Sequence, residues 1–207
     1  MREERICFRS DQWDLEGLYH ESDSGLGVVI THPHPLYGGD MFNPVVEAIA
    51  DAYRKQRFAT LRFNFRGTGQ SGGAYDQGIG EQDDVAGAIA FLKERGITGI
   101  HLSGYSFGSY VNAMAMQKGL SVEGATLVAP PVAFIEFREG IRLPTLTAVV
   151  AGSRDEFAPP PQIRRHLSQW NPDSRFHIIE GADHFYFGYL DEVTATLSGH
   201  IQHSIRS

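Results

Sequence analysis

A pentapeptide of the form Gly-x-Ser-x-Gly, residues 104–108, constrains the fold of this chain more than any other stretch. The apolar run 97–102 before it is typical of a buried strand, and the stretch 109–118 after it favours a helix. A sharp strand–turn–helix connection is the context in which a nucleophile elbow forms. Ser106 is therefore a candidate nucleophile, and the N–H of Phe107, which opens the helix, is a candidate donor to an oxyanion.

The pentapeptide alone is a weak signal. Three fixed residues, with glycine and serine at average usage, match by chance in about one chain in ten of this size. A glycine-rich turn with an incidental serine is therefore an alternative reading of residues 104–108. A catalytic reading requires a base, an acid and a second oxyanion donor in the loops that follow other strands.

The rest of the chain alternates between strand-like and helix-like segments, which predicts a mostly parallel sheet with helices on both faces. Further strands are expected at 26–31, 58–63, 124–129, 145–151 and 175–179, and helices at 44–57, 81–95, after the prolines 159–161 up to about 170, and from about 188. Two short alternating segments, 5–9 and 15–20, predict an antiparallel N-terminal hairpin at a sheet edge. With no repeat and no linker in 207 residues, we expect a single domain, 1–207.

Composition limits the expected partners. The formal net charge of −7 argues against nucleic acid. Cys7 is the single cysteine, so no intrachain disulfide can form. The charged N-terminal residues lead into no apolar signal region, and no apolar run approaches the roughly 20 residues of a membrane span. We therefore expect a cytoplasmic monomer or homodimer that acts on a small molecule, without membrane or nucleic-acid partners.

The candidate acid and base come from loops that follow two strands, because ligands bind at the carboxyl ends of strands in such a sheet. Asp155 follows the strand 145–151, with Glu156 as a competing carboxylate, and His184 follows the strand 175–179. An ordinary turn aspartate is the alternative for Asp155. Serine, aspartate and histidine in this chain order are typical of one triad-bearing fold and not of the others.

The loop after the strand 26–31 holds two histidines, His32 and His34. Their spacing could suggest a metal site, but no further ligands lie near them in the sequence, so we expect neither a metal nor a cofactor. The prolines on either side of His34 have no N–H to donate. The backbone N–H of His34 is therefore the first choice for the second oxyanion donor, and that of Leu36 is the second choice.

The glycine-rich loop at 64–73 resembles a phosphate-binding loop. It lacks the lysine of the nucleotide-binding P-loop, and Arg66 precedes its glycines instead. A tight structural loop that shapes the site is the preferred interpretation.

Taken together, these motifs resemble the α/β-hydrolases along nearly the whole chain. Five pieces correspond to that family: His32-Pro33-His34 in place of the oxyanion loop, Arg66-Gly67-x-Gly69-x-Ser71, the elbow at Ser106, Gly-x-x-Asp155 and Gly-x-x-His184. The chain is similar to a small, capless subgroup of bacterial hydrolases related to dienelactone hydrolases, which use cysteine where this sequence has Ser106. The His-Pro-His-Pro form departs from the common His-Gly pattern, which leaves the second donor open between His34 and Leu36.

The resemblance implies a triad of Ser106, Asp155 and His184 on an α/β-hydrolase fold without a cap domain, since only residues 130–144 are available for an insertion. We expect a serine hydrolase that cleaves a small ester or thioester through an acyl-enzyme, with an amidase or peptidase, or a non-catalytic ligand-binding protein, as alternatives. Residues expected in the substrate pocket, unless they are core, are Leu36, Tyr37, Phe134, Phe137, Phe157, Phe185 and Tyr186.

Overall fold

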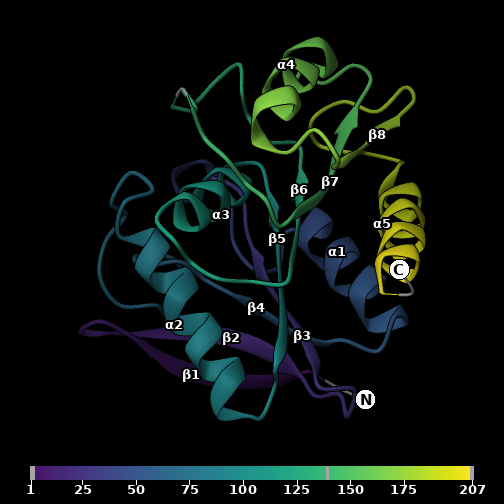
Figure 1. Ribbon diagram of the computed structural model, residues 1–207. Coiled ribbons are helices and arrows are strands. Elements are labelled where there is room, and N and C mark those ends of the chain that lie inside the picture. Colours follow the sequence, from purple (N-terminus) through teal and green to yellow (C-terminus); the bar gives the residue numbers. More distant parts are fainter. Residues whose placement is uncertain (1–2, 139, 206–207) are drawn as a thin grey trace.

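The computed structural model describes residues 3–138 and 140–205 (Figure 1). In this part of the chain eight strands form one sheet in the order β1-β2-β4-β3-β5-β6-β7-β8. Their bounds are β1 Glu4–Ser10, β2 Trp13–His20, β3 Leu26–Thr31, β4 Ala59–Phe63, β5 Gly99–Tyr105, β6 Gly124–Val128, β7 Leu146–Gly152 and β8 Arg175–Ile179. The pairs β1–β2 and β2–β4 are antiparallel, and all other neighbours are parallel. The predicted mostly parallel sheet with an N-terminal hairpin is confirmed.

Helices cover both faces of this sheet (Figure 1). Helices α1 (Pro44–Lys55) and α5 (Leu190–Ser204) pack against each other, and α2 (Glu81–Glu94) lies beside α3 (Phe107–Gln117). Helix α4 (Pro160–Trp170) packs on β7, and a short 3-10 turn, η1 (Pro35–Tyr37), follows β3. No helix or strand lies between β6 and β7 in the described residues, as expected for a hydrolase without a cap.

The predicted elements lie close to the observed ones, with one informative difference. Strand β5 continues three residues beyond the apolar run, because Ser103, Gly104 and Tyr105 pair with β6 as far as Val128. Ser103 and Gly104 break the apolar pattern, so the sequence gives no sign that the strand continues to Tyr105. The neighbouring strand supplies the pairing, and Ser106 follows directly at the end of β5.

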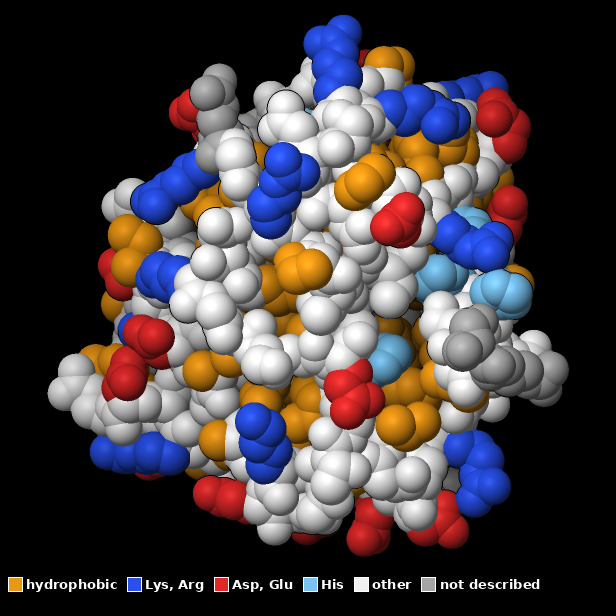
Figure 2. Space-filling model, viewed as in Figure 1, with side chains coloured by type: hydrophobic (Ala, Val, Ile, Leu, Met, Phe, Trp, Pro, Cys, Tyr) orange, Lys and Arg blue, Asp and Glu red, His pale blue; other side chains and the backbone are white. Residues whose placement is uncertain are grey.

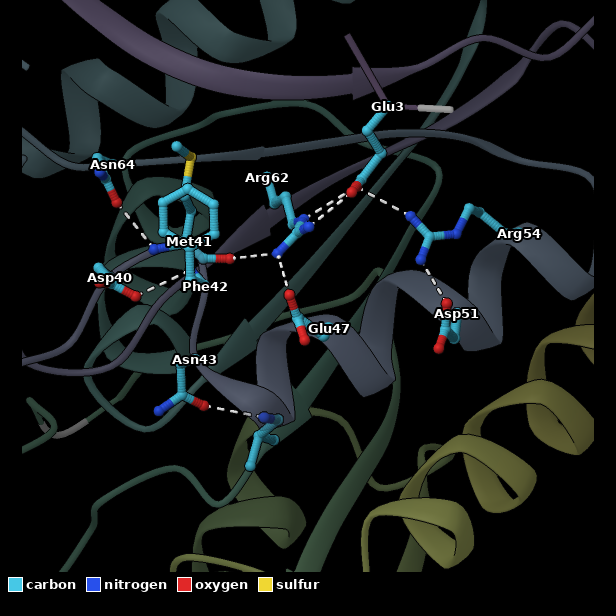
Figure 3. A network of polar contacts seen from close by, with 11 residues as sticks. Glu3, Asp40, Met41, Phe42, Asn43, Glu47, Asp51, Arg54, Arg62 and Asn64 are labelled. Atoms are coloured by element: carbon cyan, nitrogen blue, oxygen red, sulfur yellow. Dashed lines mark hydrogen bonds and ion pairs between the residues drawn. The ribbon is translucent and has the colours of Figure 1, made fainter. Parts of the chain in front are cut away.

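A polar network fixes the segment that joins β3 to α1 (Figure 3). Arg62 on β4 is 5% exposed and donates to the carbonyl oxygen of Met41 at 2.7 Å and to both carboxylate oxygens of Glu3. The amide oxygen of Asn64 accepts the N–H of Met41 at 2.8 Å. Asn43 then caps α1 by accepting the N–H of Val45, with Pro44 as the first helical residue. The start of α1 is thus held by the neighbouring strand.

The face of the molecule in Figure 2 carries acidic and basic side chains both at its rim and across its middle, with apolar side chains between them. None of the helices in residues 3–138 and 140–205 is both long enough and apolar enough to cross a membrane.

Candidate active site

The elbow at Ser106 is built by close packing of its two glycines. A Cβ at Gly104 would lie 2.6 Å from the carbonyl carbon of Gly108, and a Cβ at Gly108 would lie 2.5 Å from the carbonyl oxygen of Thr31. Any side chain at either position would therefore push α3 away from the sheet. Ser106 itself has φ 53° and ψ −117°, a strained conformation for a residue with a side chain. This backbone geometry aims the serine hydroxyl away from both β5 and α3.

Three side chains that are far apart in the sequence form a hydrogen-bonded chain. The Oγ of Ser106 lies 2.9 Å from Nε2 of His184, and Nδ1 of His184 lies 2.8 Å from Oδ2 and 3.0 Å from Oδ1 of Asp155. A carboxylate can only accept, so the neutral imidazole donates from Nδ1 and presents the lone pair of Nε2 to the serine hydroxyl. The geometry has the form of a nucleophile, a base and an orienting acid.

The carboxylate of Asp155 also organises its own turn. Oδ1 accepts the backbone N–H of Phe157 at 2.9 Å and that of Ala158 at 2.8 Å. Asp155 is therefore an ordinary turn aspartate, and this does not conflict with its candidate role as the acid, because the same carboxylate also contacts His184. The competing carboxylate, Glu156, is exposed, whereas Asp155 is buried at 3% exposure.

Tyr105, which precedes the serine, was not expected in the site. Its hydroxyl donates to the carbonyl oxygen of His184 at 2.9 Å, and burial raises its pKa well above the ordinary value, so the phenol keeps its proton. This bond ties the elbow to the loop that carries the imidazole. No pattern in the sequence indicates it, because it depends on how β5 and the loop after β8 meet in space.

The loop at 33–39 brings the candidate second donor to the same place. The N–H of Leu36 donates to Nδ1 of His34 at 3.3 Å, whereas the N–H of His34 makes no hydrogen bond to another of the described residues. Burial lowers the pKa of the His34 imidazole, so the ring is neutral near pH 7 and its Nε2–H donates to the hydroxyl of Tyr75 at 3.1 Å. Of the two donors considered, the geometry favours His34 over Leu36.

A cleft of about 470 Å³ opens over Ser106 and His184. One wall is the loop at 33–39 with Asn43, and the other is the segment at 131–135 with Phe157 and Phe185. Four of the residues predicted for the pocket line this cleft: Tyr37, Phe134, Phe157 and Phe185.

Three other residues named for the pocket lie elsewhere. Leu36 is 67% exposed and does not line the cleft, because the turn η1 directs its side chain to solvent. Phe137 packs in the core against Tyr110 and Trp170, and Tyr186 is fully buried. For the latter two the core alternative is correct.

The glycine-rich loop and His32 are structural. Arg66 forms a buried pair with Asp84 at 2.8 Å, and none of the residues 64–73 lines the cleft, so the loop does not shape the site directly. His32 accepts the N–H of Phe65 at Nε2, and burial lowers its pKa to about 4. In the described residues, no group of three or more histidine, cysteine or acidic side chains is placed to hold a metal ion.

The sheet has eight strands in this order, a strained serine lies at a strand–helix turn, and no cap covers the cleft above it in the described residues. These features define the class of α/β-fold serine hydrolases that lack a lid. The chain matches the Alpha/beta hydrolase family over residues 28–195, and it belongs to that family.

Similar proteins agree with this membership. An alpha-beta serine hydrolase homologue from Coxiella burnetii is 32% identical, with a TM-score of 0.89 over 97% of this chain and 98% of that one. XC6422 from Xanthomonas campestris, a serine hydrolase without lid, is 25% identical, with a TM-score of 0.89 over 98% and 95% of the two chains. The uncharacterized protein RP471 of Rickettsia prowazekii is 26% identical over 95% of this chain and 88% of its own.

Proposed function

We propose that this hydrolase cleaves small esters or thioesters through a covalent acyl-enzyme on Ser106. The observation that carries the proposal is the 2.9 Å contact between Ser106 Oγ and His184 Nε2 at the floor of an open cleft. A serine hydroxyl is a weak nucleophile unless a base takes its proton, and an imidazole at this distance can do so.

The reaction runs in two halves. Ser106 Oγ forms a bond to the acyl carbon while His184 Nε2 takes the hydroxyl proton, and the imidazolium then gives that proton to the leaving alcohol or thiol as its bond to carbon breaks. Water attacks the acyl-enzyme in the same manner, giving a proton to His184, which returns it to Ser106. Throughout, Asp155 fixes the orientation of the ring and stabilises its positive charge.

The negative charge that develops on the acyl oxygen is held by backbone N–H groups. Phe107 opens α3, so its N–H has no partner within the helix and lies at the positive end of the helix dipole. The proposed second donor is the N–H of His34, a residue of the loop that lines the cleft. The loss of one such donor costs roughly 3 kcal/mol of transition-state stabilisation.

The test is covalent labelling with a fluorophosphonate probe. We expect an adduct on Ser106 in the native protein and none in Ser106→Ala. Ser109→Ala is the matched control, because Ser109 lies in the first turn of α3, directly after the elbow, and its hydroxyl donates to the carbonyl oxygens of Gly104 and Val128. Labelling of Ser106→Ala as strong as that of the native protein would refute the assignment.

A panel of matched esters, thioesters and amides then distinguishes the acyl bond that is cleaved. We expect kcat/KM for esters and thioesters to exceed that for amides. An amide preference would instead support the amidase alternative.

A further inference from the structure

The lining of the cleft carries no formal charge. None of the described residues that line it is an aspartate, glutamate, lysine or arginine, although these types make up 21% of the chain. The histidine on the loop wall, His34, is neutral near pH 7 because burial lowers its pKa. A charged group bound here would lose water without gaining an opposite charge, which is costly.

Aromatic rings form a continuous arc along the cleft. Tyr37 meets Phe134 edge-on with ring centroids 6.3 Å apart, and Phe134 meets Phe157 at 5.7 Å and 70°. Phe157 in turn lies 6.3 Å from Phe185 and 4.7 Å from the imidazole of His184. The arc therefore begins at η1, crosses the segment between β6 and β7, and ends beside the proposed base.

These rings are uncovered to an unusual degree. The exposed fractions are 76% for Tyr37, 54% for Phe134 and 53% for Phe185, and the three residues come from three separate segments. Large apolar side chains that converge from different segments on one cleft mark a ligand-binding surface more often than scattered exposure does. Because these rings line the same cleft as Ser106, a chemical group that binds against them belongs to the substrate.

We infer that the substrate of this hydrolase presents an uncharged aromatic ring to the arc formed by Tyr37, Phe134, Phe157 and Phe185. The inference rests on the proposed function and adds the class of substrate. Aromatic rings attract one another edge-to-face or offset at centroid distances of about 4.5–7 Å, beyond what burial alone supplies. Neighbouring rings of the arc lie 5.7–6.3 Å apart and contact one another, so a substrate ring that lies against the exposed surface of the arc can contact two of them at once.

The decisive comparison is between methyl phenylacetate and methyl cyclohexylacetate, whose leaving group carries no ring. The two esters share a leaving group and an unconjugated carbonyl, and differ in whether the six-membered ring is aromatic. The cyclohexyl group is the more apolar, so burial alone favours it. After correction for their hydroxide-catalysed rates, we expect kcat/KM to be about two- to tenfold higher for the aryl ester, the factor for one aromatic pair. The 4-carboxyphenylacetate ester should be turned over at least about tenfold more slowly than its uncharged parent.

Phe134→Leu tests the arc itself, because it keeps an apolar side chain and does not contact His184 in the described structure. It should reduce the ratio of aryl to cyclohexyl kcat/KM toward one. Phe42→Leu is the matched control, since the Phe42 ring is also partly exposed but lies near Arg5 and Arg62, outside the cleft. It should leave the ratio unchanged.

Binding to Ser106→Ala separates this inference from the proposed function, because it needs no turnover. Phenylacetamide should bind that variant more tightly than cyclohexylacetamide. The aromatic assignment would be overturned if the cyclohexyl compound were turned over or bound as well as the aryl compound, or better. It would also be overturned if Phe134→Leu left the ratio of aryl to cyclohexyl kcat/KM unchanged. Equal turnover of the carboxylated and parent esters would overturn the requirement for an uncharged group. Absence of any Ser106-dependent ester turnover would refute the proposed function, and the amide binding preference would still decide the inference.

Discussion

At the scale of single residues, the carboxylate of Asp155 makes two separate sets of hydrogen bonds. It accepts two backbone N–H groups of its own turn and, on the same side chain, the Nδ1 proton of His184. The turn therefore holds the carboxylate in place before any substrate binds, and the carboxylate in turn sets the orientation of the imidazole. The position of the carboxylate is thus fixed by the local backbone.

Substitution of Asp155 by asparagine should separate these two roles. Asparagine can still accept the N–H groups of the turn through its amide oxygen, but its amide N–H₂ favours the wrong imidazole tautomer. We expect kcat for a p-nitrophenyl ester to fall by about 10⁴-fold, as for such a change in a serine-protease triad, with little change in the free energy of unfolding. Glu156→Gln, next to it and exposed, is the control and should keep native kcat. The reverse pattern would show that the acid is Glu156.

His101 on β5 gives a prediction about pH. Burial lowers its pKa from the ordinary 6.5 to about 4, so between these values the unfolded chain binds a proton that the folded chain does not. Stability therefore falls as the pH drops from 6.5 toward 4. In His101→Leu that contribution is absent, and the slope of unfolding free energy against pH should be shallower by up to about 1.4 kcal/mol per pH unit. Urea titrations at a series of pH values measure the slope. Equal slopes for the two proteins would contradict the prediction.

At the scale of elements, hydrogen bonds from side chains on or just after β4 position the loop that follows β3. The loop after β3 reaches α1 through Met41, whose N–H and carbonyl oxygen are both bonded to side chains of or just after β4 (Figure 3). Asn43, two residues later, lines the cleft as well as capping α1. Strand β4 therefore positions one wall of the cleft although none of its residues lines that cleft.

Arg62 should accordingly matter for stability far more than an exposed arginine. Arg62→Met leaves the carbonyl oxygen of Met41 unpaired and removes the bidentate partner of Glu3. Removing one partner of a buried pair costs about 3–5 kcal/mol, and we expect about 2–3 kcal/mol here because Glu3 keeps Arg54. Arg57→Met breaks the exposed pair with Asp23 and should cost less than about 1 kcal/mol. Chemical denaturation compares the two variants, and equal losses would show that the Arg62 network adds no more stability than an exposed ion pair.

The order and type of the elements were predictable, and their contacts were not. Alternating apolar and polar segments indicate the strands and helices, and Asn43-Pro44 marks the start of α1 correctly. The turn η1 was not predicted, since a three-residue 3-10 turn has no periodicity to detect. The end of β5 was missed because pairing with β6, and not its own side chains, makes residues 103–105 a strand.

At the scale of the whole molecule, the site is assembled from distant parts of the chain. Chain order and loop position were enough to name Ser106, Asp155 and His184, which the structure brings within hydrogen-bond distance. The bonds of Tyr105 to His184 and of Tyr75 to His34 depend on side-chain directions in three dimensions, which no motif encodes. For the same reason, the sequence could not show that Phe137 and Tyr186 are in the core whereas Phe134 lines the cleft.

The open cleft gives a prediction about chain length. Between β6 and β7 the described residues form no helix or strand that could close over the site, so a long acyl chain has little wall to bury against. Each buried CH₂ contributes about 0.8 kcal/mol only where such a wall exists. In a series of straight-chain p-nitrophenyl esters, we expect kcat/KM to be highest for short chains and to fall beyond medium length.

The same series above and below the solubility limit tests for a lid. Lids produce a jump in rate at a lipid interface because they open there, and we expect no jump. A maximum at long chains, or a sharp rise at the interface, would show that the segment 130–144 or a second copy of the chain closes the cleft.

The backbone of Ser106 has a consequence for how this protein can be improved. Its φ of 53° with ψ −117° costs a residue with a side chain on the order of 1–3 kcal/mol, whereas glycine adopts such angles freely. Relief of that strain exceeds the roughly 0.5–1 kcal/mol of extra chain entropy that glycine brings. Heat resistance and chemistry thus favour different residues at position 106. A directed-evolution screen that rewards only thermal tolerance would enrich glycine there and return stable proteins that lack the proposed nucleophile.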